Sequence, residues 1–145
     1  MRVIVLSVGR LRPPYADDVQ HYSKLLSRYV RLELVEVRDG GRVPGRLPQG
    51  PAGGGAGAFV SELHSSGQAF SSEAFAAFLE QRRRSGRDLC FVIGGAFGLG
   101  ADARPHAEHR FSLGPMTLPH QLARVVLLEQ LYRGHKILAG EPYHH

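Results

Sequence analysis

The stretch LCFVIGGAFGLG, residues 89–100, decides the fold class of this chain. Its first part, residues 89–93, is a short apolar run of the kind found in strands that are buried on both faces of a parallel sheet. Its second part, residues 94–100, is rich in glycine and follows the run directly. Open α/β sheets usually bind ligands at such a loop, because small residues let backbone N–H groups approach the ligand. The stretch therefore predicts an α/β protein in which this loop is either a ligand loop or a tight turn.

The residue pattern of the glycine-rich loop is a weaker signal of ligand binding than the position of the loop after a strand. GGAFGLG lacks the Lys-Ser/Thr pair of a phosphate-binding P-loop, and its spacing does not give the dinucleotide motif GxGxxG. A small nucleotide-binding protein that uses this loop for phosphates is therefore an alternative that rests on fold analogy alone.

Apolar patterns on both sides of this stretch predict alternating strands and helices. Residues 32–37 alternate apolar and charged side chains, so we expect this strand to lie near an edge of the sheet. Together the patterns predict a single α/β domain over residues 1–145 with a mainly parallel sheet of about five strands. The expected strands are 3–8, 32–37, 59–63, 89–93 and 111–113, with a turn at 65–67, and the expected helices are 16–30, 72–84, 102–109 and 120–132.

Residues 39–58, DGGRVPGRLPQGPAGGGAGA, interrupt this alternation. Glycine and proline dominate the segment and no apolar period is visible, so we expect a flexible loop without a helix. A loop of this length is unusual inside a compact domain. It is therefore interpreted either as a functional flap or as an eroded connection.

The composition makes nucleic acid the first partner to consider. The chain of 145 residues carries a formal net charge of +5, which favours attraction to a polyanion, although codon bias explains an arginine excess equally well. The only cysteine, Cys90, lies in an apolar run, so we expect a buried thiol in a reducing, cytoplasmic protein. No segment resembles a secretory signal peptide or approaches the roughly 20 apolar residues of a membrane helix.

Two groups of polar residues have a structural and a functional interpretation. Candidate metal ligands are present at His106, Glu108 and His109, but no further ligand follows at a recognisable spacing. We therefore expect no metal, and two histidines that face solvent from a short helix. The arginines of QRRRSGR, residues 81–87, are expected to complement a helix dipole and to face solvent, with RNA phosphate contact as the alternative.

The proline of the segment MTLP, residues 116–119, predicts the backbone conformation of that segment. Pro119 holds Leu118 in an extended conformation and begins the next helix abruptly. Ordered, exposed backbone at that place could hold an adenine edge or an amino acid end. Any turn from a strand into a helix would look similar, so the pattern alone does not name a ligand.

Three motifs in the second half of the chain carry a resemblance to a known family. FVIGGAFGLG, FSLGPMTLPHQLARVVLLEQLYR and GEPYHH, in this order, resemble the ribosomal RNA large subunit methyltransferase H family of the SPOUT superfamily. The resemblance is dense over residues 88–145 and traceable through VIVLSVGRLR, LVEVRD and SELHSSGQAFSSEAFAAFL.

The resemblance implies a SPOUT-type five-stranded, mainly parallel sheet with a C-terminal trefoil knot. It also implies a homodimer in which S-adenosyl-L-methionine, the methyl donor, binds among the knot loops near the subunit interface. The residues that match the donor pocket of the family are Leu63, Gly95, Gly114, Pro115, Met116, Thr117, Leu118 and Pro119.

The function implied by the resemblance is methylation of N3 of a pseudouridine in 23S rRNA of the large ribosomal subunit. Such a reaction requires positioning, a proton acceptor and stabilisation of the developing uracil anion. Tyr143 and His144 match positions that handle the base, and Arg133, Arg124 and His120 are expected to assist them.

The chain departs from the family pattern in two places, and the first of them motivates a second hypothesis. Residues 39–58 stand where relatives have a helix, and His64 replaces a carboxylate after Leu63. The alternative is therefore a noncatalytic RNA- or ribosome-binding module on a degenerate SPOUT fold.

Overall fold

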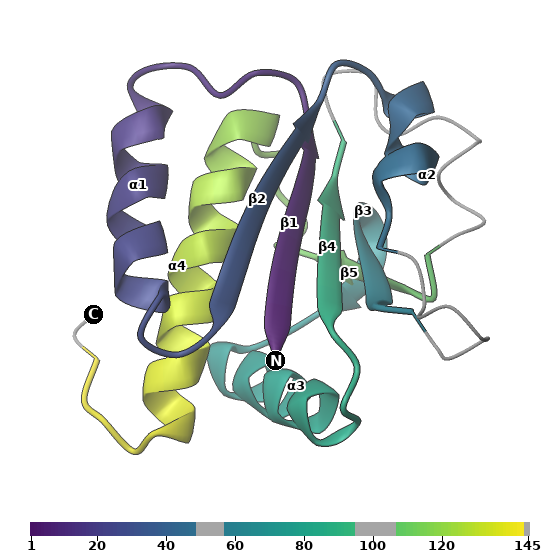
Figure 1. The fold of residues 1–145 in the computed structure, drawn as a ribbon. Coiled ribbons are helices and arrows are strands. Elements are labelled where there is room, and N and C mark those ends of the chain that lie inside the picture. Colours follow the sequence, from purple (N-terminus) through teal and green to yellow (C-terminus); the bar gives the residue numbers. More distant parts are fainter. Residues whose placement is uncertain (49–56, 95–106, 144–145) are drawn as a thin grey trace.

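A parallel five-stranded sheet forms the centre of the chain. The computed structural model describes residues 1–48, 57–94 and 107–143. The strand order is β2-β1-β4-β3-β5, and all neighbouring pairs are parallel (Figure 1). The elements are β1 Arg2–Val8, α1 Tyr15–Leu26, β2 Arg31–Val37, the 3-10 helix η1 Gly40–Arg42, α2 Val43–Arg46, β3 Phe59–Ala69, α3 Ser72–Arg84, β4 Leu89–Ile93, β5 His109–Ser112 and α4 His120–Leu138. The expected α/β class and parallel sheet are confirmed, and β2 is the edge strand that its alternating pattern predicted.

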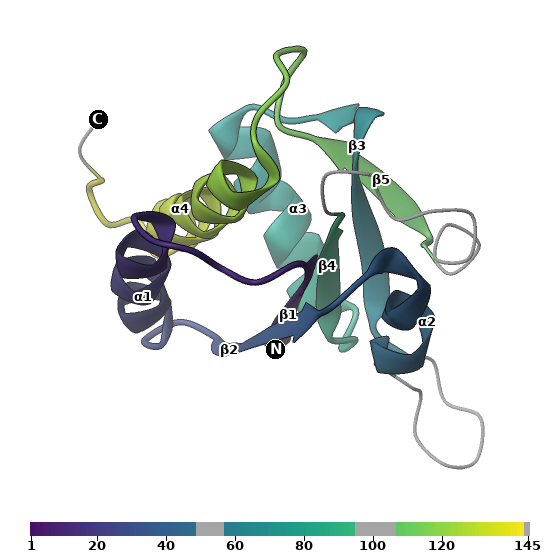
Figure 2. The same cartoon turned by 90° about the horizontal axis from the view of Figure 1, so that it is seen from above.

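Helices cover both faces of the sheet. Figure 2 shows α1, α3 and α4 on one face and α2 on the other. Side chains of β1 alternate between the two layers: Val3 and Val5 belong to the core under α1, α3 and α4, whereas Ile4 and Leu6 belong to the core on the α2 side. The continuous apolar runs of β1 and β4 follow from this burial on both faces.

The segment after β2 contains a short helix that the sequence did not predict. Residues 40–46 form η1 and α2, so the expectation of a helix-free loop is wrong for this part, and residues 49–56 of the loop lie outside the described residues. Pro44 occupies the first turn, where its fixed φ suits a helix start. Val43 and Leu47, four residues apart, are buried against the second face of the sheet. The high glycine and proline content of the segment concealed the helical spacing of these two apolar residues in the sequence.

Strand β3 continues through the turn that was expected at residues 65–67. Its pairing with β5 shifts between Leu63 and Gln68, and both of these residues are in register with Phe111. The returning segment lies against β5 so closely that a Cβ on Gly67 would stand 2.6 Å from the carbonyl carbon of Phe111. Only glycine fits there, and its role in a close backbone approach was mistaken for a turn signal.

The helix limits differ from the expected ones in a few places. α3 matches, and the Ser71 hydroxyl accepts a hydrogen bond from the Ala74 N–H at 3.0 Å, as an N-cap residue does. α1 ends at Leu26 rather than near residue 30, and α4 continues to Leu138. The helix expected at 102–109 is wrong at its end, because His109 begins strand β5, and residues 102–106 lie outside the described residues.

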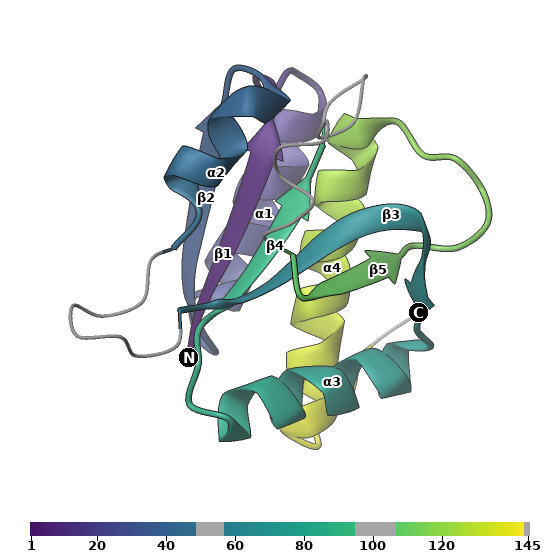
Figure 3. The same cartoon turned by 90° about the vertical axis from the view of Figure 1, so that its right-hand side faces the viewer.

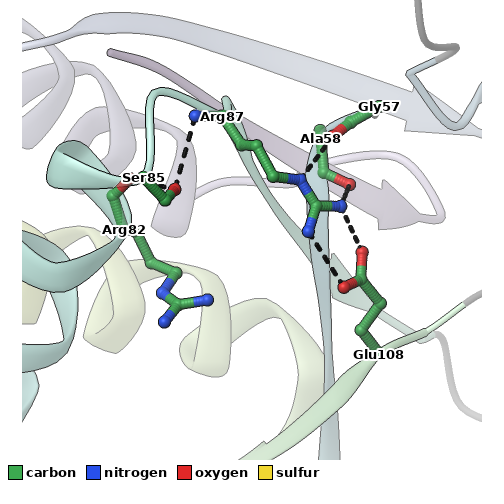
Figure 4. Close-up of polar contacts among 6 residues, drawn as sticks. All are labelled: Gly57, Ala58, Arg82, Ser85, Arg87 and Glu108. Carbon is green, nitrogen blue, oxygen red and sulfur yellow. Dashed lines mark hydrogen bonds and ion pairs between the residues drawn. The ribbon is translucent and has the colours of Figure 1, made fainter. Parts of the chain in front are cut away.

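Arg87 joins three segments at the start of the sheet (Figure 4). Its guanidinium donates to the carbonyl oxygens of Gly57 at 2.8 Å and Ala58 at 3.1 Å, and it pairs with Glu108 just before β5. The hydrogen bonds to Glu108 raise the pKa of Arg87. This cluster fixes the beginnings of β3, β4 and β5 relative to one another.

None of the helices in the described part of the chain is long and apolar enough to cross a membrane.

Candidate functional site

Because the strands are parallel, their carboxyl ends meet at one edge of the sheet. At this edge the segment between β5 and α4 forms a wide loop beside the bend of β3 (Figure 3). A cavity of about 180 Å³ lies between them. Its walls come from Leu63, His64 and Ser65 of β3, from the run 112–118, and from Ala123 of α4.

Both ends of the 112–118 loop are held by local interactions. The Ser112 hydroxyl donates to the carbonyl oxygen of Gly114 at 3.0 Å and accepts from the Gly114 N–H at 3.1 Å. Gly114 has a φ of +118°, which a residue with a Cβ rarely adopts. Pro119, with ψ 139°, is extended and begins α4. The middle of the loop is open, with Met116 81% exposed.

The loop offers unused backbone hydrogen-bonding groups to the cavity. Within the described part of the chain, the N–H groups of Met116, Thr117 and Leu118 have no hydrogen-bond partner. Backbone N–H groups in proteins normally donate a hydrogen bond to another protein group, to a ligand or to water. With Leu63 and Leu118 as apolar walls, the cavity can accept a flat ligand that has polar atoms along one edge.

Six of the eight expected donor-pocket residues line this one cavity. They are Leu63, Gly114, Pro115, Met116, Thr117 and Leu118. Pro119 follows them at the start of α4, and Gly95 lies outside the described residues. A larger cavity of about 260 Å³ shares Ser112, Leu113 and Gly114, but its remaining walls are largely apolar. The smaller cavity therefore suits a polar ligand better.

His120 and Arg124 lie together where β1 ends. Arg124 is 5% exposed and donates to the carbonyl oxygens of Val8 at 2.8 Å and Gly9 at 2.6 Å. A Cβ on Gly9 would stand 3.9 Å from His120 Nε2 and 3.7 Å from Arg124 Nη2. Burial, with Arg124 and Arg12 nearby, lowers the pKa of His120, so its imidazole is neutral and able to accept a proton at neutral pH.

Arg133 and Tyr143 form a separate group on the other half of α4. The Arg133 guanidinium lies 4.1 Å from the centre of the Tyr143 ring, and Glu129 accepts from the Tyr143 hydroxyl at 2.9 Å and from Arg133 Nε at 3.0 Å. Burial and the hydrogen bond to Glu129 raise the pKa of Tyr143 to about 12. Tyr143 therefore stays protonated at neutral pH and acts as a hydrogen-bond donor. Sequence reasoning missed Glu129, although its spacing of four from Arg133 is the usual signal of an ion pair.

One chain does not bring all expected residues to one place. Tyr143 contacts the side chains of Glu129, Tyr132 and Arg133. None of these side chains lines the cavity at residues 112–118. Figure 1 shows why: α4 runs from the carboxyl edge of the sheet, where His120 begins it, toward the opposite edge, where the tail leaves it. His144 lies outside the described residues.

His109 has a position that the sequence did not predict. It lies in β5 rather than on a helix, and its ring packs on Phe78 with ring centres 5.2 Å apart. Its Nδ1 is 2.7 Å from Ser61 Oγ, and its Nε2 is 2.8 Å from Gln68 Oε1. The imidazole thus joins the two ends of the β3 bend that carries His64 and Ser65. The expectation of a solvent-facing histidine is wrong here, and His106 lies outside the described residues.

The arginines at the end of α3 do not all face solvent. Arg82 lies over the ring of Phe59, with its guanidinium carbon 4.3 Å from the ring centre. Arg83 and Arg84 are exposed and pair with Glu80 at 2.6 and 3.0 Å. In the ranges 1–48, 57–94 and 107–143, no group of three His, Cys, Asp or Glu side chains is placed to hold a metal ion.

Comparison with known proteins shows the family to which this chain belongs. A family model described as "Predicted SPOUT methyltransferase" matches residues 1–144. The chain belongs to the SPOUT methyltransferases. Within them it is similar to proteins named "Ribosomal RNA large subunit methyltransferase H". The relative from Nitratidesulfovibrio vulgaris (strain DP4) is 42% identical, covering 97% of this chain and 96% of its own, and the one from Sorangium cellulosum (strain So ce56) is 42% identical over the whole of both chains.

A third relative, from Pelotomaculum thermopropionicum, carries the same name. It is 41% identical over 99% of this chain and 98% of its own. The family resemblance drawn from the late motifs is therefore confirmed along nearly the full chain, and the chain is a member of the ribosomal RNA large subunit methyltransferase H family of SPOUT methyltransferases.

Proposed function

We propose that this protein is an S-adenosyl-L-methionine-dependent methyltransferase that modifies N3 of a pseudouridine in 23S rRNA of the large ribosomal subunit, in the cytoplasm. The observation that carries the proposal is the cavity formed by Leu63 and residues 114–118 in a SPOUT methyltransferase chain. The names of the relatives support ribosomal RNA as the substrate.

The cavity fits the methyl donor chemically. The free N–H groups of Met116, Thr117 and Leu118 match the acceptor atoms along the edge of an adenine, while Leu63 and Leu118 can pack on its faces. When bound, S-adenosyl-L-methionine supplies an electrophilic methyl group. The protein's own residues hold the donor, orient the base and take up the proton.

The target nitrogen must lose its proton before it can form a bond to carbon. A neutral imidazole is the suitable acceptor, so we assign this role to His144 or His120, the latter with a lowered pKa. Tyr143 donates its single hydroxyl proton to Glu129, so its oxygen is held in place to accept a hydrogen bond from an N–H group of the base. Arg133 and Arg124 supply positive charge for the negative charge that develops on the ring.

The separation of the tail from the cavity supports a homodimer. In one chain, Tyr143 and Arg133 lie apart from residues 114–118. We propose that the tail of one subunit closes over the donor cavity of the other, so that each working site contains residues from both chains. A C-terminal trefoil knot and a place for Gly95 beside the donor belong to the same proposal.

The noncatalytic RNA-binding alternative loses part of its support. It rested on a missing helix after β2, and the structure has α2 there, packed through Val43 and Leu47. Calorimetric titration with S-adenosyl-L-methionine separates the two functions. A micromolar site, weakened in a Thr117→Pro variant that lacks one loop N–H, is the expected result. RNA binding without measurable donor binding would establish the alternative instead.

A further inference from the structure

A groove lined by arginine lies at the carboxyl ends of β1 and β2. Two open hollows, of about 490 and 330 Å³, adjoin each other at Glu36, Val37 and Arg38, which line both, and together they are called the groove here. One hollow extends to Arg42 and Arg46 of the η1–α2 segment, and the other extends to Gly9 and Arg10 after β1. This groove was not anticipated from the sequence, because its arginines lie in three separate segments.

The charges in the groove are unbalanced. Arg10, Arg38 and Arg46 are exposed, and no carboxylate of the described residues lies within ion-pair distance of them. The two acidic residues nearby are already engaged. Glu36 accepts from the Leu11 N–H at 2.7 Å and from Arg124 at 3.4 Å, and Asp39 pairs with Arg42 at 3.5 Å. The groove therefore carries a net positive charge that nothing in the described chain neutralises.

The groove lies on the same edge of the sheet as the donor cavity. The cavity lies at the carboxyl end of β5, beside the bend of β3, and the groove lies at the carboxyl ends of β1 and β2, which are parallel to them. The start of α4 connects the two sites: Leu118 lines the cavity, and His120 lies next to Gly9, which lines the groove. Figure 2, viewed from above this edge, shows α2 and the start of α4 on either side of β1 and β4.

We propose that this groove binds the phosphate backbone of the RNA strand that carries the target nucleotide. The proposal rests on the proposed function and names the surface that holds its substrate. Guanidinium groups bind phosphate oxygens through two parallel hydrogen bonds, and an open groove suits a chain better than a small enclosed molecule. A Cβ on Gly45 would meet nothing within 4 Å, so no other part of the described chain covers the surface beside Arg46.

The test compares two double variants that each remove two positive charges. Arg38→Gln/Arg46→Gln removes two of the three unpaired cations of the groove. Arg83→Gln/Arg84→Gln, at the end of α3 away from this edge, is the control, because it also removes two positive charges from exposed positions. Binding of each variant to protein-free large-subunit rRNA and to large ribosomal subunits is measured over a range of salt concentrations, alongside calorimetric titration with S-adenosyl-L-methionine.

We expect the groove variant to bind RNA on the order of tenfold more weakly than the wild type, with a log–log salt slope smaller by about 1.5. Donor affinity should be unchanged in both variants, and the control should keep wild-type RNA affinity and slope. Equal RNA affinity and slope in the two double variants would overturn the proposal. A loss seen with ribosomal subunits but not with protein-free rRNA would overturn it as well, since the groove would then contact protein. Failure of the wild type to methylate RNA would refute the proposed function without affecting this binding comparison.

Discussion

The guanidinium of Arg133 lies over the ring of Tyr143, 4.1 Å from its centre, and Glu129 binds both side chains. This three-residue group holds the tail against α4. Two further contacts support it: Tyr29 donates to Glu141 at 3.2 Å, and Lys136 donates to Glu141 at 2.8 Å. Glu141 and Tyr143 are thus held in place by their side chains, which is what a residue that acts on a substrate requires.

Replacing Tyr143 by Phe tests the role of its hydroxyl group. The ring and its contact with Arg133 remain, so we expect unchanged folding and donor affinity. Turnover should fall on the order of 10- to 100-fold, because the hydroxyl oxygen that positions the base is lost. Single-turnover methyl transfer at saturating donor measures this. Tyr15→Phe, on α1, is the control and should have wild-type turnover.

Mixed dimers test whether the tail acts on the partner's cavity. Neither a variant lacking residues 143–145 nor the Thr117→Pro variant should transfer methyl groups efficiently alone. Coexpressed in equal amounts, half of the dimers are mixed and each has one complete site, so about a quarter of wild-type turnover should return. A mixture no more active than its components would place the tail and the cavity of one chain in the same site.

His109→Ala tests the clamp across the β3 bend. Loss of the contacts to Ser61 and Gln68 and of the ring packed on Phe78 should lower the free energy of unfolding by about 2 kcal/mol. Donor affinity should also fall, because His64 and Ser65 line the cavity on that bend. Chemical denaturation and calorimetric titration measure the two effects. His21→Ala, at an exposed position of α1, should change neither quantity.

The buried histidine of α4 should make the protein sensitive to acid. His135 is 8% exposed and stacks on Tyr29, and its Nε2 has no hydrogen-bond partner among the described residues. Burial lowers its pKa below the value of about 6.5 that it has in the unfolded chain. The unfolded state therefore binds the proton more readily, so stability is fully present above about pH 6.5 and decreases below it.

The measurement is the free energy of unfolding at several pH values between neutral and mildly acidic conditions. A single group of this kind contributes at most about 1.4 kcal/mol per pH unit. His135→Phe keeps the aromatic contact and should reduce this slope. The same slope in the variant and the wild type would show that other groups, such as His109 and His120, account for the acid sensitivity.

Sequence patterns predicted the sheet because its strands are either continuous apolar runs or regular alternations. The β1 and β4 runs are buried on both faces, and the alternation in β2 marks its edge position. Patterns failed where a tertiary contact decides the conformation. Val43, in α2, and Leu47, just after it, are buried against the sheet, and Gly67 marks a close approach to Phe111 rather than a turn.

The part of the candidate site that one short run of sequence forms was predictable. Residues 114–118 are contiguous, so motif and cavity coincide. Glu129, His109 and the arginines of the groove were missed because their roles depend on segments distant in sequence. The separation of Tyr143 from the cavity also has no signal in the sequence, since it depends on the direction of α4 relative to the sheet.

Methyl transfer to ribosomes is the most direct test of the central claim. The protein is incubated with labelled S-adenosyl-L-methionine and large ribosomal subunits from cells that lack the pseudouridine methylation, and the labelled nucleotide is identified by mass spectrometry. We predict label on N3 of a single pseudouridine of 23S rRNA, lost in the Thr117→Pro variant. Intact donor binding with no label in rRNA, or label on a different base, would contradict the account.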